Sequence, residues 1–158
     1  AYGDPDELNF HIDNIGNSGY SNGLVSPSHI ASGSSSSTIT GSSFNFEGAY
    51  LTGAWRDGLN INIQGFLGGS LLYDTTVVVD STAPTWFDFN YLGIDTLAFD
   101  SYGGTAHGYS ASGLILDGDH FVMDNFNYTY AKVPEPISLV LLGFGLVGLG
   151  FSRRKKAA

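Results

Sequence analysis

Short runs in which apolar and polar residues alternate make up most of the chain, and glycine or asparagine turns separate these runs. In the clearest run, residues 59–64, the side chains of Leu59, Ile61 and Ile63 share one face and amide side chains share the other. No window carries the 3.6-residue apolar stripe of an amphipathic helix. The pattern therefore predicts an all-β body of half-buried antiparallel strands.

Turn signals divide this body into strands. Residues 67–70 read Leu-Gly-Gly-Ser and lead into residues 71–80, whose Thr-Thr-Val-Val-Val stretch favours a strand, so a hairpin is predicted there. Further strands are expected at residues 8–12, 38–41, 44–46, 49–55, 85–90, 95–100 and 120–131. Short strands at this spacing predict an antiparallel β-sandwich. Residues 32–37 and 101–113 are rich in serine or glycine and are expected to be surface loops.

Composition limits what this body can do. Of the 158 residues, 42% are hydrophobic and none is cysteine, which excludes a disordered chain and a disulfide scaffold. Residues 1–132 carry 14 acids and 2 bases, whereas residues 133–158 carry 1 acid and 4 bases. Because the acidic body would repel a phosphate backbone, no nucleic acid is expected as a partner. The change of composition places a domain boundary between a β domain at 1–132 and a segment at 133–158.

The C-terminal segment has the order of a membrane anchor with a stop: a proline-flanked acid, an apolar run at residues 137–151, and a basic cluster. As a helix the run would span about 22 Å, and flanking residues would cover the rest of a bilayer core of about 30 Å. The alternative is a buried C-terminal helix of a soluble domain. The motif residues are Pro134, Glu135 and Pro136, and the membrane-stop residues are Arg153, Arg154, Lys155 and Lys156.

Triplet, apolar helix and basic end together resemble the PEP-CTERM sorting domain. The resemblance implies a Gram-negative bacterium in which an exosortase reads the tail, cleaves near the triplet and passes the protein to the outer surface or extracellular matrix. The chain opens at Ala1 without a methionine, so we expect that a signal peptide has been removed or that the sequence is a fragment.

Four stretches of the body, residues 49–59, 91–97, 103–105 and 120–126, are similar to jelly-roll domains often found ahead of such tails. Those domains share their fold with calcium-dependent carbohydrate-binding modules. The resemblance therefore implies an antiparallel jelly-roll β-sandwich with a structural calcium ion at Asp124 and Asn125.

A calcium site at this pair would need further ligands, because calcium takes about six to eight oxygens. Backbone carbonyls and early acids would complete it if the first and last strands pair. The candidate acids are Asp4, Asp6, Glu7 and Asp13. The alternative is that Asp124 and Asn125 only cap a bulge.

Aromatic side chains are candidates for a sugar site, because a pyranose face stacks on indole or phenol rings while amides and carboxylates bind its hydroxyls. The candidate platforms are Trp55, Trp86, Tyr91, Tyr102 and Tyr109. Trp55 and Trp86 lie within β runs, where large rings usually fill the core, so packing is the favoured interpretation for these two. Tyr102 and Tyr109 lie in the glycine-rich stretch 101–113 and are expected at the surface.

The sequence shows no motif typical of nucleophilic, metal-dependent or phosphate-transferring enzymes. It predicts a non-enzymatic, exported protein whose β domain binds polysaccharide or neighbouring proteins and whose C-terminal helix sorts it. A structural subunit that self-assembles through strand edges and the apolar tail is the alternative from another class. A glycan-active enzyme is the third hypothesis.

Overall fold

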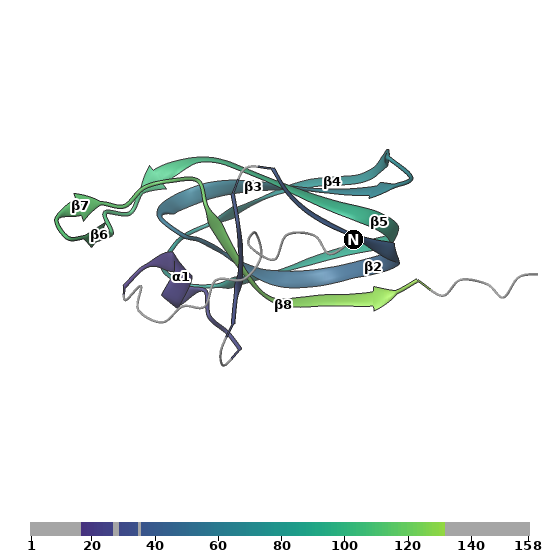
Figure 1. The fold of residues 1–158 in the computed structure, drawn as a ribbon, viewed down its shortest axis with the longest axis horizontal. Coiled ribbons are helices and arrows are strands. Elements are labelled where there is room, and N and C mark those ends of the chain that lie inside the picture. Colours follow the sequence, from purple (N-terminus) through teal and green to yellow (C-terminus); the bar gives the residue numbers. More distant parts are fainter. Residues whose placement is uncertain (1–16, 27–28, 35, 132–158) are drawn as a thin grey trace, which may run out of the picture.

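The computed structural model describes residues 17–26, 29–34 and 36–131, which are almost entirely β-structure (Figure 1). The all-β class predicted from the alternation is confirmed. The elements are α1 (Gly19–Asn22), β1 (Ala31–Gly33), β2 (Ser37–Gly53), β3 (Arg56–Leu67), β4 (Ser70–Val79), β5 (Thr85–Ala106), β6 (Ser110–Ala111), β7 (Leu114–Ile115) and β8 (Phe121–Tyr130). The strand expected at residues 8–12 and the expected C-terminal helix lie outside the described residues.

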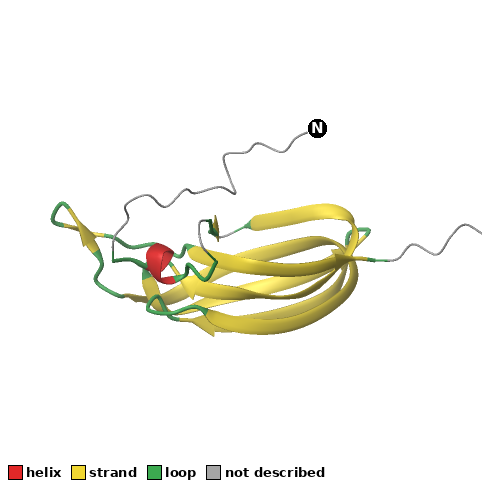
Figure 2. Cartoon of the chain, turned by 90° about the horizontal axis from the view of Figure 1, so that it is seen from below, coloured by secondary structure: helices red, strands yellow, loops and turns green. Residues whose placement is uncertain are grey.

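Six strands form one antiparallel sheet in the order β1-β8-β2-β5-β3-β4, and β6 and β7 form a separate two-stranded hairpin. The sheet curls along the length of its strands, as Figure 2 shows, and closes over its own apolar face. The described strands therefore enclose a core by curvature within one sheet. The jelly-roll connectivity implied by the resemblance stays a prediction.

The long strand β2 replaces the three strands expected at residues 38–41, 44–46 and 49–55. Register shifts against β5 between Thr40 and Gly48 mark bulges, which bend a strand and increase its twist without ending it. Each bulge interrupts the period-two pattern, so the sequence suggested separate strands. The expectation of many short strands is wrong here, because the bulged chain stays paired throughout.

β5 likewise joins the strands expected at residues 85–90 and 95–100, and it continues into the stretch 101–113 that was expected to be a loop. The positive φ of Gly103 and Gly104 lets the chain bend there while Ala106 still pairs with β3. The other expected loop, at residues 32–37, is shortened because both of its ends belong to strands, β1 and β2.

The main core centres on stacked aromatic rings. Phe46 is fully buried, and its ring centroid lies 4.8 Å from that of Phe126 and 5.0 Å from that of Phe89. The apolar residues of β3 are also fully buried, as their alternation predicted: Leu59, Ile61 and Ile63. A smaller core next to α1 contains Tyr20, Ile30, Ala54, Trp55, Tyr109 and Val122.

The two ends of the sheet carry different structures (Figure 1). One end of the molecule carries both the turn between β3 and β4 and, on its other side, the end of β8, where the described chain stops. Gly68 and Gly69, with φ of 56° and 80°, form this turn and confirm the predicted hairpin. The β6–β7 hairpin and α1 lie at the opposite end.

Candidate functional site

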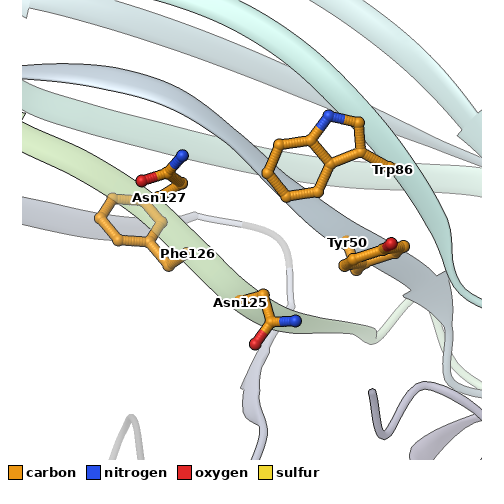
Figure 3. Close-up of a pocket in the computed structure, with 5 residues that line it drawn as sticks. All are labelled: Tyr50, Trp86, Asn125, Phe126 and Asn127. Atoms are coloured by element: carbon orange, nitrogen blue, oxygen red, sulfur yellow. The ribbon is translucent and has the colours of Figure 1, made fainter. Parts of the chain in front are cut away.

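An open depression of about 620 Å³ lies where β5, β2 and β8 run side by side (Figure 3). Its lining residues are Tyr50, Trp86, Asn125, Phe126 and Asn127. Strand register brings them together, because Tyr50 on β2 pairs with Trp86 on β5 and with Asp124 on β8. The rings of Tyr50 and Trp86 and two amides thus lie on one surface of three neighbouring strands, and the ring of Phe126, which also borders the depression, stacks on the buried Phe46.

The indole of Trp86 is held in place from two sides. Its Nε1 donates a hydrogen bond of 2.8 Å to Oδ1 of Asp88, and its ring meets that of Tyr50 edge to face at 5.2 Å. Across the strand, a Cβ added at Gly48 would come within 2.6 Å of Cζ2 of Trp86. The indole therefore occupies the space above Gly48 that any other side chain would fill.

Two asparagines form the polar side of the depression. Asn125 adopts a positive φ of 50° where the register of β8 against β2 shifts, and its side chain is exposed. The Nδ2 group of Asn127 donates a hydrogen bond of 3.0 Å to Oε2 of Glu47. Rings beside amides and carboxylates are the side chains that bind both the apolar faces and the hydroxyls of sugars.

Asp124 is buried next to the depression and binds a distant loop. Its Oδ2 accepts hydrogen bonds from the N–H groups of Val25 (2.7 Å) and Ser26 (2.8 Å), and its Oδ1 accepts one from the Ser26 hydroxyl (2.8 Å). Burial alone would raise the pKa of Asp124, but these donors and the N–H of Asn125 lower it below its ordinary value. The carboxylate is therefore an anionic latch between β8 and residues 25–26.

These contacts do not fit a calcium site at Asp124. Both carboxylate oxygens face N–H or O–H donors, whereas calcium requires a shell of oxygen acceptors. Within the described ranges, no group of three or more metal-ligating side chains occurs. The early acids suggested as further ligands lie outside those ranges, so calcium binding itself stays a prediction.

The other candidate aromatics are divided between core and surface. Trp55 is 9% exposed and packs on Tyr20 and Tyr109 in the smaller core, which agrees with the packing interpretation. The expected surface position of Tyr109 is wrong, because this residue is 6% exposed and its hydroxyl donates to the Ser81 carbonyl. Tyr102 is exposed on β5, as expected, while Tyr91 is buried. Trp86 differs from the packing interpretation by lining the depression.

A second polar cluster, which the sequence did not suggest, joins three segments at the α1 end of the sheet, where Asn22 of α1 donates a hydrogen bond to the Ser81 carbonyl. His107 Nδ1 lies 2.5 Å from Oδ2 of Asp57, and the Ser81 hydroxyl donates to Oδ1 of Asp57 at 2.7 Å. Desolvation opposes ionisation of Asp57, but hydrogen bonds from His107 and Ser81 lower its pKa to about 2. Ser81 is fully buried and bonded to the carboxylate instead of to the imidazole, so the three residues do not form a nucleophile and base.

Comparison with known families identifies the tail. Residues 132–155 match the PEP-CTERM protein-sorting motif, which confirms the signal predicted at Pro134, Glu135 and Pro136. The motif indicates an exported cell-surface protein of a Gram-negative bacterium, processed by an exosortase and membrane-anchored before processing. No curated protein and no solved structure shows significant similarity to the chain. Among the described residues, no helix has the length and hydropathy of a membrane span.

The packing of Trp86 over Gly48 predicts that Gly48→Ala destabilises the fold by about 1–3 kcal/mol and displaces the indole. The new Cβ would lie 2.4 Å from the Phe87 carbonyl oxygen as well as against the ring. Gly41→Ala is the matched control on the same strand, because no atom lies within 4 Å of its added Cβ. Urea unfolding and near-ultraviolet circular dichroism check both variants, and equal behaviour of the two would contradict the packing argument.

The Asp124 latch predicts an acid-dependent loss of stability. Because its pKa is lower in the folded state than in the unfolded chain, its stabilisation is complete above about pH 4 and declines as the pH falls further. Asp124→Asn should therefore be less stable at pH 7 and lose less on acidification than the native protein. Ser26→Ala, which removes one donor, should show a smaller effect in the same direction. Urea unfolding between pH 7 and pH 2.5 measures this, and parallel profiles for Asp124→Asn and the native chain would refute the latch.

Proposed function

We propose that the body is a non-catalytic glycan-binding domain of an exported, exosortase-processed surface protein, and that the depression at Tyr50 and Trp86 is its binding site. The observation that carries this proposal is that the aromatic rings of Tyr50 and Trp86 lie beside two asparagine side chains on one open surface. Each ring offers an apolar face for a pyranose, and the amides beside it offer donors and acceptors for hydroxyls.

Charge supports a neutral glycan as the ligand class. Two carboxylates, of Glu47 and Asp88, accept hydrogen bonds from lining residues at opposite sides of the depression. The surrounding body is strongly acidic, with 14 acids against 2 bases in residues 1–132. An uronate-rich polysaccharide would meet like charge, whereas a neutral one offers hydroxyls to the same carboxylates.

Self-assembly is the second candidate function, and the exposed edge of the sheet favours it. β4 is ten residues long and lies at one edge of the described sheet, with Val78 58% exposed. A long β-branched edge of this kind is a template for strand addition from a second copy. Electron microscopy of native material separates the candidates, since polymers that vanish when proline replaces Thr76 favour assembly.

The binding proposal predicts that Trp86→Ala weakens glycan binding about tenfold or more, which corresponds to about 1.4 kcal/mol. Tyr50→Ala should weaken it in the same direction. Tyr102→Ala is the matched control, because it removes an exposed aromatic ring of β5 that does not line the depression. A glycan array with neutral and uronate-rich oligosaccharides selects the ligand, and titration calorimetry compares the variants.

Running each titration in calcium and in EDTA tests whether the ion contributes to glycan affinity. We expect equal affinity in both, because the depression holds no group of ligating carboxylates among the described residues. Failure of the whole array to bind in either condition would refute the glycan proposal. Equal losses for Tyr102→Ala and Trp86→Ala would refute the assignment of the site.

A further inference from the structure

Exposed apolar side chains gather at the end of the sheet from which the described chain leaves the body. We call this set the apolar end. Its members are between 45% and 69% exposed: Leu67, Leu71, Leu72, Leu92, Tyr128 and Tyr130. Solvent-exposed leucines in such a group mark a surface that contacts an apolar partner.

Strand register places these residues near one level of the sheet, within about two residues of each other along β5. Phe44 on β2 pairs with Tyr130 on β8 and with Ile94 on β5, and Phe66 on β3 pairs with Leu71 on β4. The row moves along β5 by two residues, from Ile94 to Thr96, which pairs with Thr40 on β2 and with Phe66 on β3. Figure 1 shows the same arrangement, with the β3–β4 turn and the end of β8 at one end of the molecule.

Leu92 is fixed to this level by the neighbouring hairpin. The Tyr73 hydroxyl accepts a hydrogen bond from the Leu92 N–H at 3.1 Å and donates one to its carbonyl at 3.3 Å. Leu92 is nevertheless 60% exposed, and Leu71 and Leu72 directly precede Tyr73 in β4. The Tyr73 hydroxyl therefore links the exposed leucines of β4 to the exposed leucine of β5 through the backbone.

Chain length ties the apolar end to the membrane anchor. β8 ends at Tyr130, and only residues 132–136 separate Ala131 from the apolar run that begins at Ile137. At no more than about 3.6 Å per residue, this connection reaches about 20 Å at full extension. The end of β8 must stay within that distance of the bilayer core whenever the tail is inserted.

We propose that the apolar end is a lipid-contacting surface that rests on a zwitterionic phospholipid bilayer while the tail anchors the protein. Leucines at the turn would enter the interface, and Tyr128 and Tyr130 would lie at headgroup level, where tyrosine is favoured. The proposal rests on the sorting tail as anchor and is independent of glycan binding. It gives the body a fixed orientation before exosortase processing.

The charges near the apolar end select the type of lipid. Asp95 accepts a hydrogen bond from the Gly68 N–H at 2.7 Å, which places it at the β3–β4 turn, and Asp74 lies three residues after Leu71 on β4. Arg56, the one lysine or arginine among the described residues, is paired with Asp117 elsewhere. Lys132 follows Ala131 in the sequence but is outnumbered by the two acids at this end, so anionic headgroups would be repelled and zwitterionic ones preferred.

Single-cysteine labelling tests this contact, because the chain has no cysteine of its own. Leu71→Cys and Leu92→Cys, each carrying an environment-sensitive fluorophore, are compared with Leu114→Cys on β7. Leu114 is 72% exposed and lies at the opposite end of the sheet, which makes it the matched control. The full chain is inserted into phosphatidylcholine nanodiscs, with or without nitroxide-labelled lipid, and nanodisc-bound protein is isolated.

We expect blue-shifted emission and strong nitroxide quenching at positions 71 and 92, and neither effect at position 114. Replacing a third of the lipid with phosphatidylglycerol should reduce the quenching at 71 and 92. Quenching at those positions no greater than at 114 would overturn the proposal. A blue shift without nitroxide quenching would also overturn it, because the surface would then be covered by protein, either residues 1–16 or a second copy. Failure of the chain to enter nanodiscs would also overturn the proposal, because the tail would then not be the anchor on which the proposal rests.

Discussion

The described body depends on one constraint: a single six-stranded sheet has to cover its own apolar face. The only helix among the described residues has four residues, so no helical layer is available there to bury the rings around Phe46. Curvature supplies the cover. The register shifts in β2 and the positive-φ residues Asn90 and Gly93 in β5 let two long strands bend while their backbone groups stay paired. Burial of the core therefore depends directly on the curvature of the sheet.

The same bulges produce the candidate site on the outer surface. A flat strand would alternate strictly, but the shift near Gly48 brings Tyr50 opposite Trp86 while the glycine leaves room for the indole. On the other side of β2, the irregularity at Asn125 separates the latch residue Asp124 from the lining residues that follow it. A change that straightened β2 or β8 would disturb the core and the depression together. The shape of the depression therefore follows from the same bulges that let the sheet curl over its core.

The parts of this arrangement that depend on local pattern could be predicted from the sequence. The alternation at Leu59, Ile61 and Ile63 and the glycine turn after Leu67 both gave correct local structure. The sorting tail was also recognisable, because its triplet, apolar run and basic end are contiguous. Each of these signals is complete within a short stretch of chain.

Features that depend on distant partners could not be found in this way. The role of Asp124 is set by the N–H groups of Val25 and Ser26, roughly a hundred positions away, and nothing near Asp124 in the sequence names them. Trp86 looked like a core residue, because only the register with Gly48 and Tyr50 shows which face it occupies. Tyr109 looked like a loop residue, although its ring completes a core with Trp55. In each case the local pattern fits two interpretations equally well, and a contact with a distant residue decides between them.

The proposed binding surface and the proposed lipid surface share β2, which fixes their separation. Phe44 lies in the row at the apolar end and Tyr50 lies in the depression, six residues further along, so the two levels are about 20 Å apart at the rise of a β-strand. A glycan held at Tyr50 would therefore run above the lipid headgroups and not among them. Every lining residue of the depression precedes Tyr130, so cleavage of the tail near its triplet would release the anchor and leave the binding surface whole. In this arrangement, sorting and binding are carried by separate segments, and the short connection between them orients the body only while the anchor is present.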